Sequence, residues 1–148
     1  VFTRQGLPVL DLNEYPQIED GVKRGAYILL DPPDHDPEII LMASGSEVHL
    51  AISVAKALTS KKIRVISVPC MELFDEQNEE YKQALLPNNV RQRFAIEAGR
   101  GDIWYKYVGL DGAVFGMDQF GASAPAHDLA QKYGFTPDQI IEWIKERI

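Results

Sequence analysis

The chain has 148 residues, 45% hydrophobic and 25% charged, and its 15 Lys and Arg against 22 Asp and Glu give a formal net charge of −7. This composition predicts one globular domain and excludes a disordered or fibrous chain. The acidic balance disfavours nucleic acid and anionic membranes as partners. The single Cys70 cannot form an internal disulfide, and no apolar run reaches the roughly 20 residues of a membrane span. We therefore expect a cytoplasmic protein without a metal site.

Residues 1–25 show neither a two-residue nor a 3.6-residue apolar period, and they contain Pro8, Pro16 and several glycines. A long irregular stretch is unusual inside a compact domain unless it is a linker or lies on another structure. Because the segment also carries many apolar side chains, we interpret it as a connector that packs on a neighbouring domain of a longer protein. The globular domain is accordingly expected to span residues 26–148.

Two short apolar runs, 26–30 and 38–43, flank the turn-rich sequence DPPDHDP and predict an antiparallel hairpin. The spacing of apolar residues then predicts an amphipathic helix over 48–59. A β-branched strand follows at 63–69. The next predicted helix covers 75–87, with Asp75 as its N-cap and Pro87 at its end. Residues 93–98 and 112–116 predict two further strands.

Two helices are predicted at the end of the chain. The first ends at Gly134 and Phe135, which is typical of a Schellman motif. The second begins at Thr136 and Pro137, and its apolar stripe contains Ile140, Ile141, Ile144 and Ile148. The alternation of strands and helices predicts an α/β fold: a three-layer α/β/α domain with a five-stranded mixed sheet, mostly parallel with one antiparallel strand.

The strand at 93–98 is followed by the first candidate site. Ligands of open α/β sheets bind outside the carboxyl ends of the strands, which indicates Glu97 and Gly99. The sequence WYKY follows, and its three aromatic side chains cannot all face one core. Trp104, Tyr105 and Tyr107 are therefore candidates for contact with a ligand or, as we favour, with another domain or subunit.

The sequence SGSE at 44–47 allows two interpretations. It lies between a strand and a helix, where backbone N–H groups can hold an anion. Ser44 followed by Glu47 is also a capping box, which would occupy those N–H groups and which we favour. None of the three histidines has a nucleophile or acid at catalytic spacing, so the residues themselves indicate no catalytic set.

Three stretches carry a resemblance to a known family: ILMASGSEVHLA at 40–51, EAGRGD at 97–102 and the long glycine-punctuated block at 104–136. With them, the chain resembles the carboxyl-terminal part of transketolase. This resemblance implies a homodimeric transferase of the pentose phosphate pathway, acting on sugar phosphates. Such an enzyme moves a two-carbon ketol unit from a ketose phosphate to an aldose phosphate with thiamine diphosphate and Mg²⁺ or Ca²⁺.

The resemblance also places the cofactor between two preceding domains, so we expect no catalytic residue, cofactor site or metal site in this chain. Residues 1–25 would then include the end of the preceding pyrimidine-binding domain. In FTRQ, Arg4 matches the family's arginine that binds the phosphate of the sugar substrate.

Alternative functions remain open from the sequence. One is a small-metabolite-binding regulatory domain of another thiamine-diphosphate enzyme, similar to deoxyxylulose-phosphate synthase or a 2-oxoacid dehydrogenase β chain. Another is a purely structural assembly module that binds its partner through the WYKY sequence.

Overall fold

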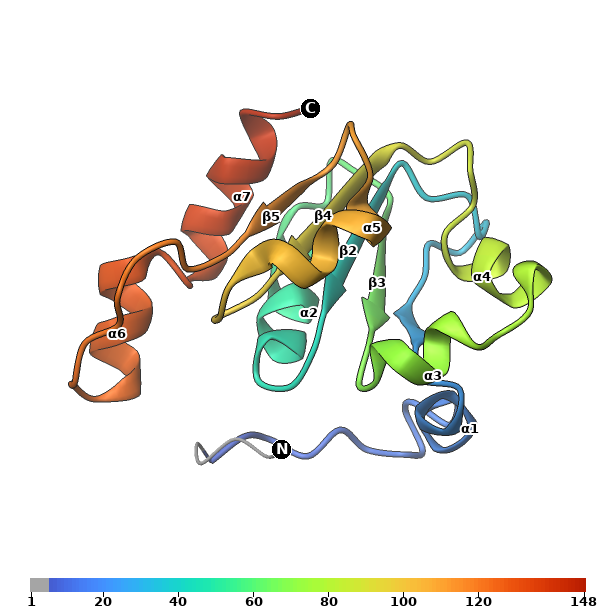
Figure 1. Ribbon diagram of the computed structural model, residues 1–148, viewed down its shortest axis with the longest axis horizontal. Helices are drawn as coiled ribbons and strands as arrows, with labels where there is room; N and C mark the ends of the chain where they lie inside the picture. The colour runs from blue at the N-terminus through green and yellow to red at the C-terminus, as the bar shows by residue number, and fades with distance from the viewer. Residues whose placement is uncertain (1–5) are drawn as a thin grey trace.

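The computed structural model describes residues 6–148 and has a five-stranded sheet at its centre, in the order β1-β3-β2-β4-β5 (Figure 1). β1 pairs antiparallel with β3, and the other three pairs are parallel. The predicted mixed sheet, mostly parallel with one antiparallel strand, is thus confirmed. The strands are β1 (Tyr27–Leu30), β2 (Ile39–Ala43), β3 (Ile63–Ser67), β4 (Gln92–Ile96) and β5 (Ala113–Phe115).

Helices cover both faces of this sheet. One face packs against α2 (Glu47–Ala57) and α7 (Pro137–Lys145). The other packs against α3 (Met71–Asp75), α4 (Glu79–Leu85), η1 (Gly101–Trp104) and α5 (Tyr105–Val108). All five side chains of β2 are buried, alternately in the two cores, as expected for a central parallel strand. The predicted three-layer α/β/α arrangement is confirmed.

The predicted hairpin of residues 26–30 and 38–43 is wrong, because β3 lies between β1 and β2. The connecting loop crosses the start of β3 and is held there by ion pairs. The buried Arg64 of β3 donates to Asp31, with 2.6 Å between Nε and Oδ1, and Lys62 pairs with Asp34. Asp31 and Asp34 of this loop thus pair with residues at or just before the start of β3 rather than forming a tight turn.

The single helix predicted over 75–87 is also wrong. Two short helices replace it, and Asp75 is the last residue of α3. Asn78 is the N-cap of α4, where its side-chain oxygen accepts the backbone N–H of Tyr81 at 2.8 Å.

The connector is more ordered than its sequence indicates. A short helix, α1 (Ile18–Lys23), forms in it, and Tyr15 is buried against the core beneath α2 and α7. The prediction of an irregular segment over 1–25 therefore fails at α1. Val9 and Leu12 remain exposed, at 94% and 55%. The domain boundary at residue 26 stays a prediction.

The two carboxyl-terminal helices form as predicted. In α6 (Ala126–Tyr133), Gly134 adopts a φ of 84° and the N–H of Phe135 donates to the Ala130 carbonyl at 2.8 Å, which is a Schellman motif. Thr136 precedes α7, whose buried stripe is Ile140, Ile141 and Ile144. Ile148 is 45% exposed, so the prediction that it extends this stripe is wrong. Within residues 6–148, no helix has both the length and the apolar character to cross a membrane.

Candidate ligand groove at the carboxyl edge of the sheet

The connections of the sheet diverge between β2 and β4. From β2 the chain enters α2 on one face and returns to β3, whereas from β4 it passes through η1 and α5 on the other face to β5. The carboxyl ends of two such strands form a crevice, and this is where α/β sheets commonly bind ligands.

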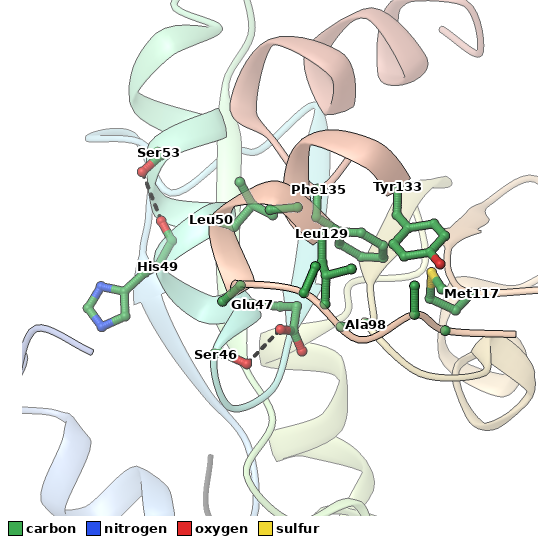
Figure 2. A pocket seen from close by; sticks show the side chains of 15 residues that line it. Ser46, Glu47, His49, Leu50, Ser53, Ala98, Met117, Leu129, Tyr133 and Phe135 are labelled. Carbon is green, nitrogen blue, oxygen red and sulfur yellow. Dashed lines mark hydrogen bonds between the residues drawn. The ribbon is translucent and has the colours of Figure 1, made fainter. Parts of the chain in front are cut away.

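A groove of about 560 Å³ opens beside this crevice, between α2 and α6, and we call it the α2–α6 groove. Figure 2 shows Leu50 of α2 facing Leu129 of α6, with Phe135, Tyr133 and Met117 on the same side as α6. The remaining lining residues are Ser46, Glu47, His49, Ser53, Ala98, Gly121, Ala122, Ala124, Ala126 and Ala130. The groove is therefore mainly apolar, and most of its polar side chains lie on or just before α2.

Glu47 is the acidic group of the α2–α6 groove. Its Oε1 accepts the Ser46 hydroxyl at 2.7 Å, and the side chain is half-buried (Figure 2). Burial raises the pKa of Glu47 above its usual 4.5; the Ser46 hydroxyl opposes the rise and the nearby Glu97 carboxylate adds to it.

The predicted capping box is wrong. Ser46, not Ser44, precedes the first turn of α2, and its side chain makes no capping hydrogen bond. Ser44 accepts the N–H of Glu47 at 3.2 Å through its backbone carbonyl. The Glu47 carboxylate also disfavours the alternative, an anion at this helix end, because two negative charges would lie together.

Glu97 follows β4 and organises the loop after it. Its two carboxylate oxygens accept separate donors: the Gly99 backbone N–H at 2.9 Å and the Trp104 indole N–H at 3.0 Å. Trp104 is fully buried in the core beneath α5. The structure thus brings Glu97, Gly99 and Trp104 together as one hydrogen-bonded unit beside the groove.

The aromatic residues of WYKY have different environments. Trp104 and Tyr107 are buried, whereas Tyr105 is 58% exposed, so Tyr105 is the one of the three that can reach a partner. The Tyr107 hydroxyl donates to Asp75 at 2.9 Å, and burial raises the pKa of Tyr107 to about 12. Arg4, the predicted phosphate ligand, lies outside the described residues.

The sequence did not predict the α6 wall of the groove. Leu129 and Tyr133 are four residues apart and share a face of α6, as a helical period requires. No residue of α6 is fully buried, so its apolar face is only partly packed against the core. The sequence pattern that could have predicted this wall is the apolar stripe of Leu129 and Tyr133 on a helix too short to build a core of its own.

Residues 25–136 match the family model described as the transketolase-like TK C-terminal domain. A probable transketolase of Streptococcus pneumoniae is 48% identical over 147 residues, which are 98% of this chain and 22% of that protein. Among solved structures, transketolase from Leishmania mexicana is 43% identical with a TM-score of 0.79, covering 86% of this chain and 18% of that one. Pichia stipitis transketolase in complex with sedoheptulose 7-phosphate is 33% identical with a TM-score of 0.79, over 86% of this chain and 18% of the other. This chain spans about a fifth of the length of the curated relatives it matches, and it belongs to the family of transketolase C-terminal domains.

Proposed function

We propose that this chain is the carboxyl-terminal domain of a transketolase. The whole enzyme would transfer a two-carbon ketol unit from a ketose phosphate to an aldose phosphate in the pentose phosphate pathway. The observation that carries the proposal is identity of 43–48% to transketolases along nearly the entire chain. The sedoheptulose 7-phosphate in the related Pichia stipitis enzyme supports sugar phosphates as the substrates. One unpaired cysteine, Cys70, agrees with a cytoplasmic location.

Thiamine diphosphate and its divalent metal, Mg²⁺ or Ca²⁺, do not fit the residues that the structure describes. Within residues 6–148, no cluster of three or more His, Cys, Asp or Glu side chains could hold a metal ion. The carboxylates at the groove would repel a diphosphate, and Glu97 already accepts two N–H donors. The proposal therefore places the cofactor in other domains of the enzyme, and we derive no catalytic step from this chain.

Arg4 is the residue proposed to act on the substrate, by binding its phosphate through two charge-assisted hydrogen bonds. In the full-length enzyme, Arg4→Ala is expected to raise KM for a phosphorylated donor about tenfold or more, the loss of 1.4 kcal/mol or more of binding. KM for hydroxypyruvate, which carries no phosphate, should change little. Equal losses for both donors would remove Arg4 from this role.

The activity itself is tested with the full-length protein, thiamine diphosphate and Mg²⁺. Ketol transfer from sedoheptulose 7-phosphate to an aldose phosphate supports the proposal. A protein that instead decarboxylates pyruvate belongs with the relatives of deoxyxylulose-phosphate synthase or the 2-oxoacid dehydrogenases, and the proposal fails.

The proposed enzyme is a homodimer, and this domain would contribute to its interface. Large apolar side chains at the carboxyl edge of the sheet support this part of the proposal: Ile103, Tyr105 and Phe120 are 56%, 58% and 99% exposed. Ile103 and Tyr105 lie in η1 and α5, after β4, and Phe120 lies in the loop after β5. The segments that follow these two strands are joined by a hydrogen bond from the Met117 N–H to the Gly99 carbonyl at 2.8 Å. Exposed apolar side chains on neighbouring segments are typical of interaction surfaces.

A further inference from the structure

The α2–α6 groove has the size and the position of a small-molecule site. Its volume of about 560 Å³ lies within the range of ligand pockets, roughly 300–1,000 Å³. It also opens beside the carboxyl ends of β2 and β4, where the connections of the sheet diverge. The proposed ketol transfer makes no use of this groove.

The charges at the groove select the class of ligand. Among the lining residues in the described part of the chain, Glu47 is the acid, and none is Lys or Arg. His49 points away from the other labelled side chains in Figure 2. The nearby Glu97 carboxylate repels the Glu47 carboxylate and adds to the negative potential. The groove would thus repel a phosphate or carboxylate and attract a cation.

The Glu47 carboxylate keeps acceptor capacity for such a cation. An ionised carboxylate has about four acceptor positions. The Ser46 hydroxyl occupies one of them at Oε1, and the backbone N–H groups of Ala98 and Glu47 also stabilise the ionised form, which leaves a position for one further donor. An N⁺–H donor in a partly desolvated position gains more from this carboxylate than a neutral donor would.

The walls of the groove suit an apolar body. Leu50 lies opposite Leu129, and the rings of Tyr133 and Phe135 stand beside them (Figure 2). The Tyr133 hydroxyl donates to the Phe120 carbonyl at 3.3 Å, which ties α6 to the segment that carries Ala122 and Ala124. The ammonium group of Lys132 already lies over the Tyr133 ring, 5.3 Å from its centroid, so this wall contributes apolar contact and the charge contact is left to Glu47.

We propose that the α2–α6 groove binds a small molecule with an ammonium group on an aromatic or aliphatic body. The ammonium group would contact the carboxylate of Glu47, and the body would lie between Leu50 and Leu129. This proposal is independent of ketol transfer, so either can fail without the other.

The test is isothermal titration calorimetry of the full-length protein with three matched indoles. Tryptamine carries the ammonium group, tryptophol is neutral and indole-3-propionate is an anion. Tryptamine is expected to bind about tenfold more tightly than tryptophol, as one charge-assisted hydrogen bond predicts, and indole-3-propionate to bind most weakly. Equal affinities for the three indoles, or no heat with tryptamine, would overturn the proposal.

Two variants locate the site. Glu47→Gln keeps the shape of the side chain, and should weaken tryptamine binding about tenfold and abolish its advantage over tryptophol. Glu76→Gln removes an exposed carboxylate outside the groove and should change neither affinity. Ala122→Trp, at an exposed position, should fill the groove and block all three indoles. Unchanged tryptamine binding in either Glu47→Gln or Ala122→Trp would show that the ammonium site lies elsewhere.

Discussion

The side chain of Trp104 connects the core beneath α5 to the carboxyl edge of the sheet. Its ring is fully buried, and its indole N–H donates to Glu97 at 3.0 Å. Glu97 in turn accepts the Gly99 N–H, so the position of the loop after β4 depends on this carboxylate. A hydrogen bond between a neutral donor and a partly buried carboxylate is among the stronger ones in proteins.

Trp104→Phe keeps an aromatic ring but removes the indole N–H. We expect it to lower the free energy of unfolding by about 2–4 kcal/mol, because a small cavity forms and Glu97 loses a donor. Trp143→Phe is the matched control, since Trp143 is half-buried and none of the hydrogen bonds found within residues 6–148 uses its indole N–H. Urea unfolding of both variants measures the difference, and an equal loss in the two would rule out the contribution of the Trp104–Glu97 hydrogen bond.

Glu47 should make the stability of the chain depend on pH. Burial raises its pKa above 4.5 in the folded state, so the folded chain binds this proton more tightly than the unfolded chain does. The ionised form is therefore destabilising, and this group's contribution to the free energy of unfolding falls as the pH rises from 4.5 through the folded-state pKa.

Glu47→Gln removes that ionisation. The free energy of unfolding of this variant minus that of the parent should increase with pH and level off above the folded-state pKa. Urea unfolding at a series of pH values from about 4.5 to 7.5 gives this difference. Glu76→Gln, at an exposed position, is the control and should shift stability by less than about 0.5 kcal/mol. A difference that stays constant with pH would mean that burial of Glu47 does not perturb its ionisation.

At the scale of elements, the crossing of β3 by the loop between β1 and β2 depends on Arg64. The residue is 4% exposed, and its guanidinium donates to Asp31, to the Ala84 carbonyl at 2.8 Å and to the Leu85 carbonyl at 3.2 Å. This side chain thus fixes the loop and the end of α4 to one strand.

Arg64→Met should therefore destabilise the chain by about 3–5 kcal/mol, because it leaves the Asp31 carboxylate without its cation. Lys62→Met breaks the neighbouring exposed pair with Asp34 and should cost less than about 1 kcal/mol. Thermal or urea unfolding of the two variants compares them directly. If both variants lose a similar, small amount of unfolding free energy, the buried contacts of Arg64 contribute no more than a surface ion pair does.

The same region shows what the sequence could and could not predict. The apolar runs located all five strands, since β2 and β3 are buried on both faces. They could not show that β3 lies between β1 and β2, because strand order depends on partners such as Arg64 and Asp31 that are distant in sequence. At the groove, the strand-end rule indicated Glu97, but Leu129 and Tyr133 come close only through the packing of α6.

At the scale of the whole molecule, the carboxyl edge of the sheet is where this domain would meet the rest of the proposed enzyme. Ile103 and Phe120 follow β4 and β5 at that edge, whereas Leu110, which is 102% exposed, precedes β5 at the opposite edge. The two edges therefore offer a matched comparison.

Ile103→Asp is expected to raise the dissociation constant of the proposed full-length homodimer at least about tenfold, because it would place a charge in the proposed apolar contact. The free energy of unfolding of the subunit should barely change, since Ile103 is 56% exposed. Leu110→Asp introduces the same charge at the other edge and should leave the dimer intact. Sedimentation velocity over a range of protein concentrations measures both constants. If Leu110→Asp dissociates the dimer and Ile103→Asp does not, the interface lies at the amino edge of the sheet, and the exposed apolar residues of the carboxyl edge have another role.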